Sequence, residues 1–297
     1  MNNQKAILEL DAKAFLAEGV LWHPLENRLY WVNIEGKELH LYDPETGIDK
    51  SFFLDERVGT VVPVKGGGAL VALQNGIHFI NTENGSLHLL VNPLPNSNIR
   101  FNDGKCDPQG RFWVGSMHLD QTESAASLYR LDTDGTVHEM VDQVTVSNGI
   151  AWTKDSTTMY YVDSPLKRID AFDFDATTGS IANRRTIAVV PQGMGEPDGI
   201  TIDTEGKLWV ALWGGSCVAR FDPSSGALME KIEVAAPHVS SCTFGGKDLD
   251  ILYISTAREG LTEEQLQKYP ESGGLFSAQP AAKGVPANFY TGQITVK

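Results

Sequence analysis

The chain has 297 residues, of which 24 are Lys or Arg and 38 are Asp or Glu, so its formal charge is −14. A chain this acidic repels phosphate backbones, which argues against nucleic acid as a partner. Its apolar runs are far shorter than the roughly 20 residues of a transmembrane helix, so no membrane association is expected. The length is enough to bury a large core and suits one all-β propeller domain over residues 1–297.

The cysteines and the N-terminal segment indicate a cellular compartment. Cys106, Cys217 and Cys242 are odd in number and widely spaced, and they form no zinc or redox motif. Reduced thiols are therefore expected. The first residues are polar and do not lead into the apolar region of a signal peptide. Both observations predict a cytoplasmic protein.

Short runs of aromatic and β-branched residues alternate with Gly-, Asp- and Pro-rich turns along the whole chain. This alternation predicts strands joined by hairpins. One short helix, with an acidic first turn, is expected at residues 262–266. The strand–turn pattern recurs in six units, at residues 16–47, 58–85, 100–135, 147–179, 197–226 and 239–276.

Four dipeptides mark one register of this repeat: Glu18-Gly19, Asp103-Gly104, Asn148-Gly149 and Asp198-Gly199. Successive glycines of the last three are 45 and 50 residues apart, and the first two are 85 apart, which is two units. A period of about 40–50 residues with four short strands is typical of a propeller blade. The sequence predicts six blades of four antiparallel strands, with residues 6–10 closing the ring as an extra strand.

The first strand of each blade lines the central channel of a propeller. Residues at one register should therefore converge at one mouth of the channel, namely Glu18, Asn102, Asp103, Asn148 and Asp198. Converging buried oxygens repel one another unless a cation or protons compensate them. Oxygen ligands favour a hard divalent ion such as Ca²⁺, Mg²⁺ or Mn²⁺. Three protein ligands would leave coordination positions for water and substrate.

A simpler interpretation is that each dipeptide is a hairpin turn, because Asp-Gly and Asn-Gly are the commonest turn dipeptides. Two observations favour the shared site. An apolar run such as Ile150-Ala151-Trp152 follows three of the dipeptides, so these open strands. The hairpin turns are already supplied downstream, for example by residues 107–110 and 203–206.

Other catalytic patterns are weaker. The seven histidines show no zinc-site spacing. His23, His40 and His78 are expected at the surface, whereas His118 ends a strand that borders the channel. No Gly-x-Ser-x-Gly motif supports a hydrolase serine.

The stretches around these dipeptides, at residues 16–22, 100–105, 147–152 and 197–200, together resemble the SMP-30/gluconolactonase/luciferin-regenerating family. The resemblance covers essentially the whole chain. Residues 211–215 and 256–261 are most similar to bacterial pentono- and hexonolactonases.

The resemblance implies a six-bladed propeller with one divalent metal held by Glu18, Asn148 and Asp198. It also implies that Arg100 and Asn102 bind the sugar and that Asp198 serves as general base or proton donor/acceptor. A further acidic contact is implied on the loop at residues 118–123, where Asp120 lies nearest to the family position and Glu123 is the alternative. Ca²⁺ is favoured by the oxygen ligands, while the family also accepts Zn²⁺, Mn²⁺, Mg²⁺ or Fe²⁺.

The expected function is metal-dependent hydrolysis of an aldonolactone, such as glucono-, xylono- or arabinonolactone, to the free aldonic acid. Two alternatives stay open: a broader esterase or phosphotriesterase on the same metal, and a non-catalytic Ca²⁺-binding regulatory propeller. The partner is then a small sugar lactone. A monomer or weak homo-oligomer is expected.

Overall fold

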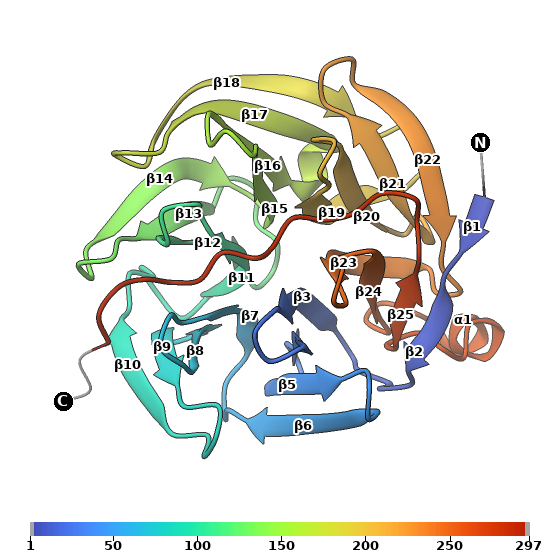
Figure 1. Cartoon of the computed structure of the whole chain (residues 1–297), viewed down its shortest axis with the longest axis horizontal. Helices are drawn as coiled ribbons and strands as arrows, with labels where there is room; N and C mark the ends of the chain where they lie inside the picture. The colour runs from blue at the N-terminus through green and yellow to red at the C-terminus, as the bar shows by residue number, and fades with distance from the viewer. Residues whose placement is uncertain (1–2, 295–297) are drawn as a thin grey trace.

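The computed structural model describes residues 3–294, and most of its regular secondary structure is β-strand. Figure 1 shows the sheets arranged around a common centre. Within the described residues, no helix is long and apolar enough to cross a membrane. The first two sheets contain β3 (Ala17–His23), β4 (Arg28–Asn33), β5 (Glu38–Asp43) and β6 (Ile48–Phe53), then β7 (Val58–Pro63), β8 (Ala69–Leu73), β9 (Gly76–Ile80) and β10 (Leu87–Val91).

The next two sheets have the same four-stranded antiparallel order. A 3-10 turn, Ser164–Leu166, follows the second strand of the fourth sheet. These sheets contain β11 (Ile99–Cys106), β12 (Phe112–His118), β13 (Ala126–Leu131) and β14 (Val137–Val144), then β15 (Ser147–Trp152), β16 (Thr158–Asp163), β17 (Arg168–Asp175) and β18 (Ser180–Val189).

The last strands form a nine-stranded sheet, but a single residue pair, Trp213 with His238, joins its two halves. Divided there, the sheets fit the predicted six blades of four strands. The halves are β19 (Glu196–Ile202), β20 (Leu208–Trp213), β21 (Cys217–Asp222) and β22 (Ala227–Glu233), then β23 (His238–Gly245), β24 (Ile251–Ala257), β25 (Leu275–Ala278) and β2 (Ile7–Leu10).

The strand predicted at residues 6–10 pairs with the last sheet, as expected. β2 runs antiparallel to β25, with Leu8 opposite Phe276, and so supplies the outer strand of the last sheet. An unpredicted strand, β1 (Asn3–Lys5), adds in parallel to β22. The predicted helix is α1 (Glu263–Lys268), which begins at a capping box formed by Thr262 and Gln265.

The core lies between neighbouring sheets. Strand residues alternate between two faces, so each sheet packs against the sheet before it and the sheet after it. Val162 of β16, for example, belongs to the same buried cluster as Val210 of β20. The buried position of His23, His40 and His78 corrects the expectation that they lie at the surface. His40 stacks on Trp31 and His23 on Tyr30, so their rings act as packing groups.

Two hairpin turns carry the same buried polar link. The Asp107 carboxylate accepts hydrogen bonds from the Gln109 and Arg111 backbone amides and, at 3.0 Å, from Trp113 Nε1. Asp203 repeats this pattern, with Trp209 Nε1 also at 3.0 Å. The predicted turns at these positions are thus confirmed, and each ties its loop to the buried indole of the next strand.

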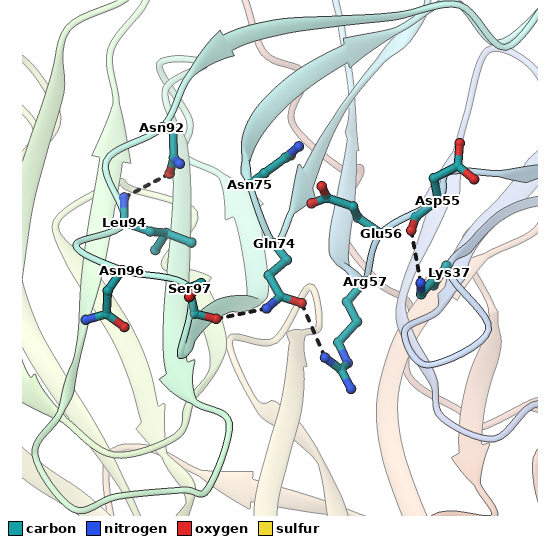
Figure 2. A pocket seen from close by; sticks show the side chains of 10 residues that line it. All are labelled: Lys37, Asp55, Glu56, Arg57, Gln74, Asn75, Asn92, Leu94, Asn96 and Ser97. Carbon is teal, nitrogen blue, oxygen red and sulfur yellow. Dashed lines mark hydrogen bonds between the residues drawn. The ribbon is translucent and has the colours of Figure 1, made fainter.

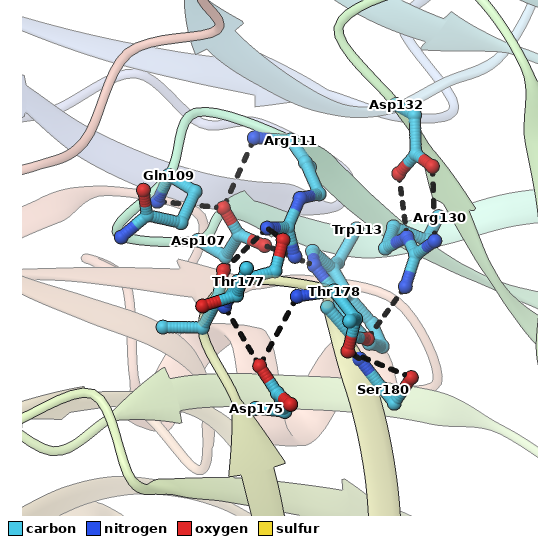
Figure 3. Close-up of polar contacts among 12 residues, drawn as sticks. Asp107, Gln109, Arg111, Trp113, Arg130, Asp132, Asp175, Thr177, Thr178 and Ser180 are labelled. Carbon is cyan, nitrogen blue, oxygen red and sulfur yellow. Dashed lines mark hydrogen bonds and ion pairs between the residues drawn. The ribbon is translucent and has the colours of Figure 1, made fainter.

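An arginine lies over the indole ring of each link. Arg130 lies over Trp113, and Arg220 lies over Trp209. Figure 3 shows that Arg111 and Arg130 also reach the β17–β18 turn, where they donate to backbone carbonyls, including that of Thr177. These arginines therefore connect the third sheet to the fourth through buried charge-assisted hydrogen bonds.

The C-terminal segment, residues 279–294, crosses one end of the ring. Figure 1 shows it in red, passing near β19, β15 and β11. Backbone hydrogen bonds hold it along its length: Gly284 N donates to Leu249 O, Tyr290 N to Pro63 O and Thr291 N to Gly110 O. We call this segment the C-terminal strap.

The Asp203 link should contribute measurably to stability. Asp203→Ala should lower the free energy of unfolding by about 2–4 kcal/mol, because Trp209 Nε1 and the Arg220 guanidinium would remain buried without their shared acceptor. Urea denaturation measures the change. Asp155→Ala, in an exposed turn, is the control and should cost less than about 1 kcal/mol. A loss no greater than the control's would mean that Glu205 and Glu230 alone satisfy Arg220.

Candidate functional site

A register irregularity interrupts the innermost strand of every sheet at nearly the same depth. The shifts lie between Glu18 and Leu21, Val58 and Thr60, Phe101 and Gly104, Ser147 and Ile150, Pro197 and Ile200, and Val239 and Ser241. A bulge bends its strand and re-aims side chains locally. The four sequence dipeptides lie in these bulges, inside strands, so the alternative that they are hairpin turns is wrong.

The glycines of these dipeptides have two uses. In two dipeptides the backbone amide donates to the preceding acid: Gly19 N to Glu18 Oε2 at 3.1 Å and Gly104 N to Asp103 Oδ1 at 2.8 Å. A glycine also allows adjacent inner strands to approach closely. A Cβ on Gly149 would lie 2.6 Å from the Asp198 carbonyl oxygen. The glycines thus place the acids and narrow the ring around them.

Three acids are buried together at this depth. Burial, supplemented by the nearby Asp103 charge, raises the pKa of Glu18 to about 8. Burial and the charges of Glu18 and Asp103 raise the pKa of Asp198 well above its usual range. Burial also raises the pKa of Asp103. The common cause is a low-dielectric setting with too little compensating positive charge, which favours protonation or a bound cation.

A chain of hydrogen bonds joins three neighbouring sheets beside these acids. Arg100 Nη1 donates to Asn102 Oδ1 at 2.7 Å, and Asn102 Nδ2 donates to Asn148 Oδ1 at 2.8 Å. Asn148 Nδ2 then donates to Ser164 Oγ at 2.8 Å, and Ser164 Oγ donates to the Pro197 carbonyl at 2.6 Å. The chain ends on the residue before Asp198. It fixes the orientation of both asparagine side chains.

The donor set is compatible with a divalent cation. Asp198 Oδ1 is buried and has no hydrogen-bond partner in the described part of the chain. Such an orphaned carboxylate oxygen needs a proton or a cation. No group of three or more His, Cys, Asp or Glu side chains in residues 3–294 is arranged to hold a metal. A set made of Glu18, Asp198 and the Asn148 amide has only two such side chains, and its oxygen chemistry suits a hard ion.

Arg100 keeps donors available for a ligand. Its Nη1 is used by Phe101 O and Asn102 Oδ1, whereas Nε and Nη2 make no hydrogen bond within the described chain. Burial lowers the pKa of Arg100, and the charges of Glu35, Glu259 and Glu18 oppose this shift. The guanidinium therefore lies among carboxylates with part of its donor fork free.

Asn102 is more fully occupied than Arg100. Its Nδ2 donates to Ser147 O and Asn148 Oδ1, so both amide protons are used inside the protein. Only its Oδ1, which accepts from Arg100, has a second lone pair to offer. Asn102 thus positions Arg100 and Asn148 in addition to any contact with a ligand.

Glu35, Arg57 and Glu259 form a charged rim near Arg100. The sequence did not single out this rim. Glu35 and Arg57 form an ion pair at 2.7 Å, and the charge of Arg57 acts on both Arg100 and Glu259. Glu259 lies in the stretch 256–261, which is similar to bacterial lactonases, so that similarity could have identified Glu259 as a site residue. Figure 2 shows Arg57 beside a groove of about 560 Å³, where Gln74 links it to Ser97.

Asp120 and Glu123 lie on an exposed loop after β12. The Asp120 amide and the Thr122 hydroxyl both lie 3.1 Å from His118 Nδ1. Within the described residues, neither acid makes a hydrogen bond or ion pair with Arg100 or Asn102. The loop begins beside Arg100, however, because Met117 pairs with Arg100 and His118 with Ile99. The loop therefore lies at the same end of the sheet as Arg100, but it does not contact the buried acids.

The sequence and fold were compared with known proteins. The family described as the SMP-30/Gluconolactonase/LRE-like region matches residues 16–258. A Bacillus subtilis protein with the provisional name sugar lactone lactonase YvrE is 39% identical over 290 residues, covering 97% of this chain and 99% of its own. Regucalcin of Danio rerio is 37% identical over 295 residues, covering 98% and 100%.

A solved structure of a relative has the same fold as this chain. The crystal structure of a calcium-binding protein, regucalcin, from Agrobacterium tumefaciens superposes with a TM-score of 0.92 at 26% identity, covering 98% of this chain and 99% of that one. The match in fold, extent and sequence leads to one conclusion: this chain belongs to the SMP-30/gluconolactonase/LRE-like family.

Proposed function

We propose that this protein is a six-bladed propeller, a single domain, that hydrolyses a sugar-acid lactone to the free aldonic acid with the help of one divalent cation. Membership of the family supports sugar-lactone hydrolysis at a coarse level. The observation that carries the proposal is the orphaned Asp198 Oδ1, buried beside Glu18 and next to the Arg100–Asn102–Asn148 chain. An aldonolactone such as glucono-, xylono- or arabinonolactone offers a carbonyl and several hydroxyl groups to this arrangement.

Glu18, Asn148 and Asp198 would hold the cation. When bound, it supplies Lewis-acid polarisation of a carbonyl and lowers the pKa of water. Ca²⁺ is favoured because all three ligands are oxygens, and a relative is described as a calcium-binding protein. Zn²⁺, Mn²⁺, Mg²⁺ and Fe²⁺ are the alternatives. The bound charge would also remove the repulsion that raises the pKa of Glu18 and Asp198.

Asp198 is the residue we assign to proton transfer. Its free oxygen can accept a proton from the water that attacks the lactone carbonyl carbon. The same carboxyl can return that proton to the ring oxygen as the ester C–O bond breaks, leaving one acid group and one hydroxyl group. Such positioned proton transfer typically contributes about 10²–10⁴-fold in rate.

Arg100 and Asn102 would orient the sugar. The free Nε and Nη2 of Arg100 can donate to substrate hydroxyls, and Asn102 holds the guanidinium in place. Buried donors of this kind discriminate against analogues that lack the matching hydroxyl. Asp120, or alternatively Glu123, would contact the substrate only if their exposed loop closes over the mouth beside Arg100.

Two other activities would use the same residues. A broader esterase or phosphotriesterase would need only the cation and Asp198. A non-catalytic Ca²⁺-binding regulator is suggested by the relatives named regucalcin. Activity on a panel of aldonolactones and simple esters, before and after metal is stripped and restored, separates the three. A lactonase needs metal and hydrolyses only the polyhydroxylated lactones. An esterase needs metal and also hydrolyses the simple esters. A regulator hydrolyses neither the lactones nor the esters.

The cellular setting is part of the proposal. The three cysteines are free and buried, which suits a reducing compartment. We infer a cytoplasmic protein that acts as a monomer or weak homo-oligomer, with a small lactone and no nucleic acid or membrane as its partner.

Glu18→Gln tests the cation ligands. The amide keeps the size of the side chain but removes a charge, so metal affinity and lactonase activity should both fall at least tenfold. Metal content by elemental analysis and folding by circular dichroism are the measurements. Glu45→Gln, in an exposed turn of the same sheet, should match the wild type. Full metal occupancy in Glu18→Gln would exclude Glu18 as a ligand.

Arg100→Ala tests substrate orientation. The variant should raise KM for an aldonolactone at least tenfold, yet change KM much less for a plain lactone without ring hydroxyls, because only the sugar uses the Arg100 donors. Steady-state kinetics on both substrates provide the comparison. Equal losses would instead mean that Arg100 is structural and neutralises Glu18, Glu35 and Glu259.

Asp198→Asn separates proton transfer from metal binding. The amide keeps an oxygen ligand but cannot act as a base, so we expect most of the metal to remain while kcat falls about a hundredfold or more. Asp198→Ala should lose both. The measurement is kcat at saturating metal. A value within a few-fold of wild type would leave Asp198 as a ligand only and make Asp103 the next base to test.

A further inference from the structure

A cavity of about 490 Å³ lies at the other end of the central channel, beneath the C-terminal strap. Five of the six innermost strands contribute to it, through residues such as Val20, Lys105, Ala151, Thr201 and Thr243. The first four of these residues follow Glu18, Asp103, Asn148 and Asp198 by two or three positions on the same strands. At about 3.3 Å per residue, the cavity begins some 7–10 Å beyond the acids. We call it the strap cavity.

The strap forms the roof of this cavity. Val285, Pro286 and Ala287 line it, and the polar groups on either side of them are fixed. Thr204 N donates to the Lys283 carbonyl at 2.8 Å, and Asn288 Nδ2 donates to the Cys106 carbonyl at 3.2 Å. The roof is therefore attached on both sides. The exposed residues Lys154 and Thr204 mark the edge where the cavity meets solvent.

Two lysines line this largely apolar space: Lys154 is exposed at its edge, and Lys105 is partly buried. Lys105 Nζ donates to the Ile200 carbonyl at 2.7 Å, which uses one of its three donors. No carboxylate of the described residues forms an ion pair with Lys105 within 4.0 Å. The Asp103 carboxylate accepts from the Gly104 amide, and the Asp203 carboxylate is taken up by Trp209 and Arg220. A partly buried ammonium with free donors is stabilised by an added anion.

The lining defines the chemical class of that anion. Most of the lining surface is apolar and includes Val20, Leu21, Ile202, Val285 and Ala287. Lys105 is its partly buried cation, whereas Lys154 lies exposed at the edge. A volume near 490 Å³ suits a small organic molecule. Hydroxyls that face the apolar part of the lining would stay unpaired, so an anion with an apolar body matches the cavity better than the polyhydroxylated product of the proposed reaction.

We propose that the strap cavity binds a small monocarboxylate with an apolar body, whose carboxylate pairs with Lys105 and whose body packs beneath the strap. The site is separate from the Glu18–Asp198 mouth and does not depend on the proposed lactonase activity. Burial lowers the pKa of Lys105, and Asp103 opposes that shift. A bound carboxylate would act in the same direction as Asp103 and hold the lysine charged.

Benzoate is the probe, and isothermal titration of the full-length protein is the measurement. Benzoate should bind the wild type with saturation at millimolar concentration or below. Lys105→Met, which keeps length but removes charge, should weaken binding at least tenfold, whereas Lys105→Arg should retain most of it. Benzyl alcohol and gluconate should each bind at least tenfold more weakly than benzoate.

Two variants serve as controls. Lys154→Met removes an exposed lysine at the edge of the same cavity, and Arg100→Ala removes the buried arginine at the opposite mouth. Both should bind benzoate within about threefold of wild type. The proposal is overturned if benzoate does not saturate, if Lys105→Met binds it as tightly as wild type, or if Arg100→Ala abolishes binding. Equal affinity for benzyl alcohol would reduce the site to an apolar cavity without anion recognition.

Discussion

The bulge in each innermost strand is the constraint on which the rest of the structure depends. An undistorted strand would send successive side chains alternately into the two neighbouring cores. The irregularities instead release Asn148 and Asp198 from the ladder, and begin directly after Glu18, at one depth. Glycine makes this arrangement feasible, because a Cβ on Gly199 would lie 2.4 Å from Ser241 Oγ. The close approach of the strands and the gathering of oxygens are thus two results of one backbone feature.

The electrostatics of the channel follow from that gathering. Burial makes each acid costly to ionise, and Arg100, whose charge acts on Glu18, is shared with the charged rim. The neutral Asn102–Asn148–Ser164 chain adds fixed dipoles without adding charge. The protein therefore keeps an uncompensated negative region in a rigid, hydrogen-bonded frame. Such preorganisation is what a cation site or a proton-transfer site requires.

The sequence predicted the repeat, the strand at residues 6–10 and the residues brought to the channel, because a fixed period in a closed ring converts sequence register into spatial position. It did not predict features outside that period. The rim residue Arg57 and the edge strand β1 follow from contacts between different units, which spacing within one unit cannot show. Asp120 was assigned only by resemblance to the family, and it lies in a loop. The repeat period does not determine the conformation of such a loop. The strap likewise lies beyond the last repeat.

The pairing of β2 with β25 has a consequence for synthesis on the ribosome. Five sheets draw their four ladder strands from one continuous stretch each, but the last combines an early strand with strands made some 240 residues later. The edge of β2 must wait, unpaired, until β25 emerges, at about 5–20 residues per second. During that interval the nascent chain carries an open sheet edge at each end of a growing arc. Closure is a late event, in which the start of the chain adds β1 to β22 and β2 to β25.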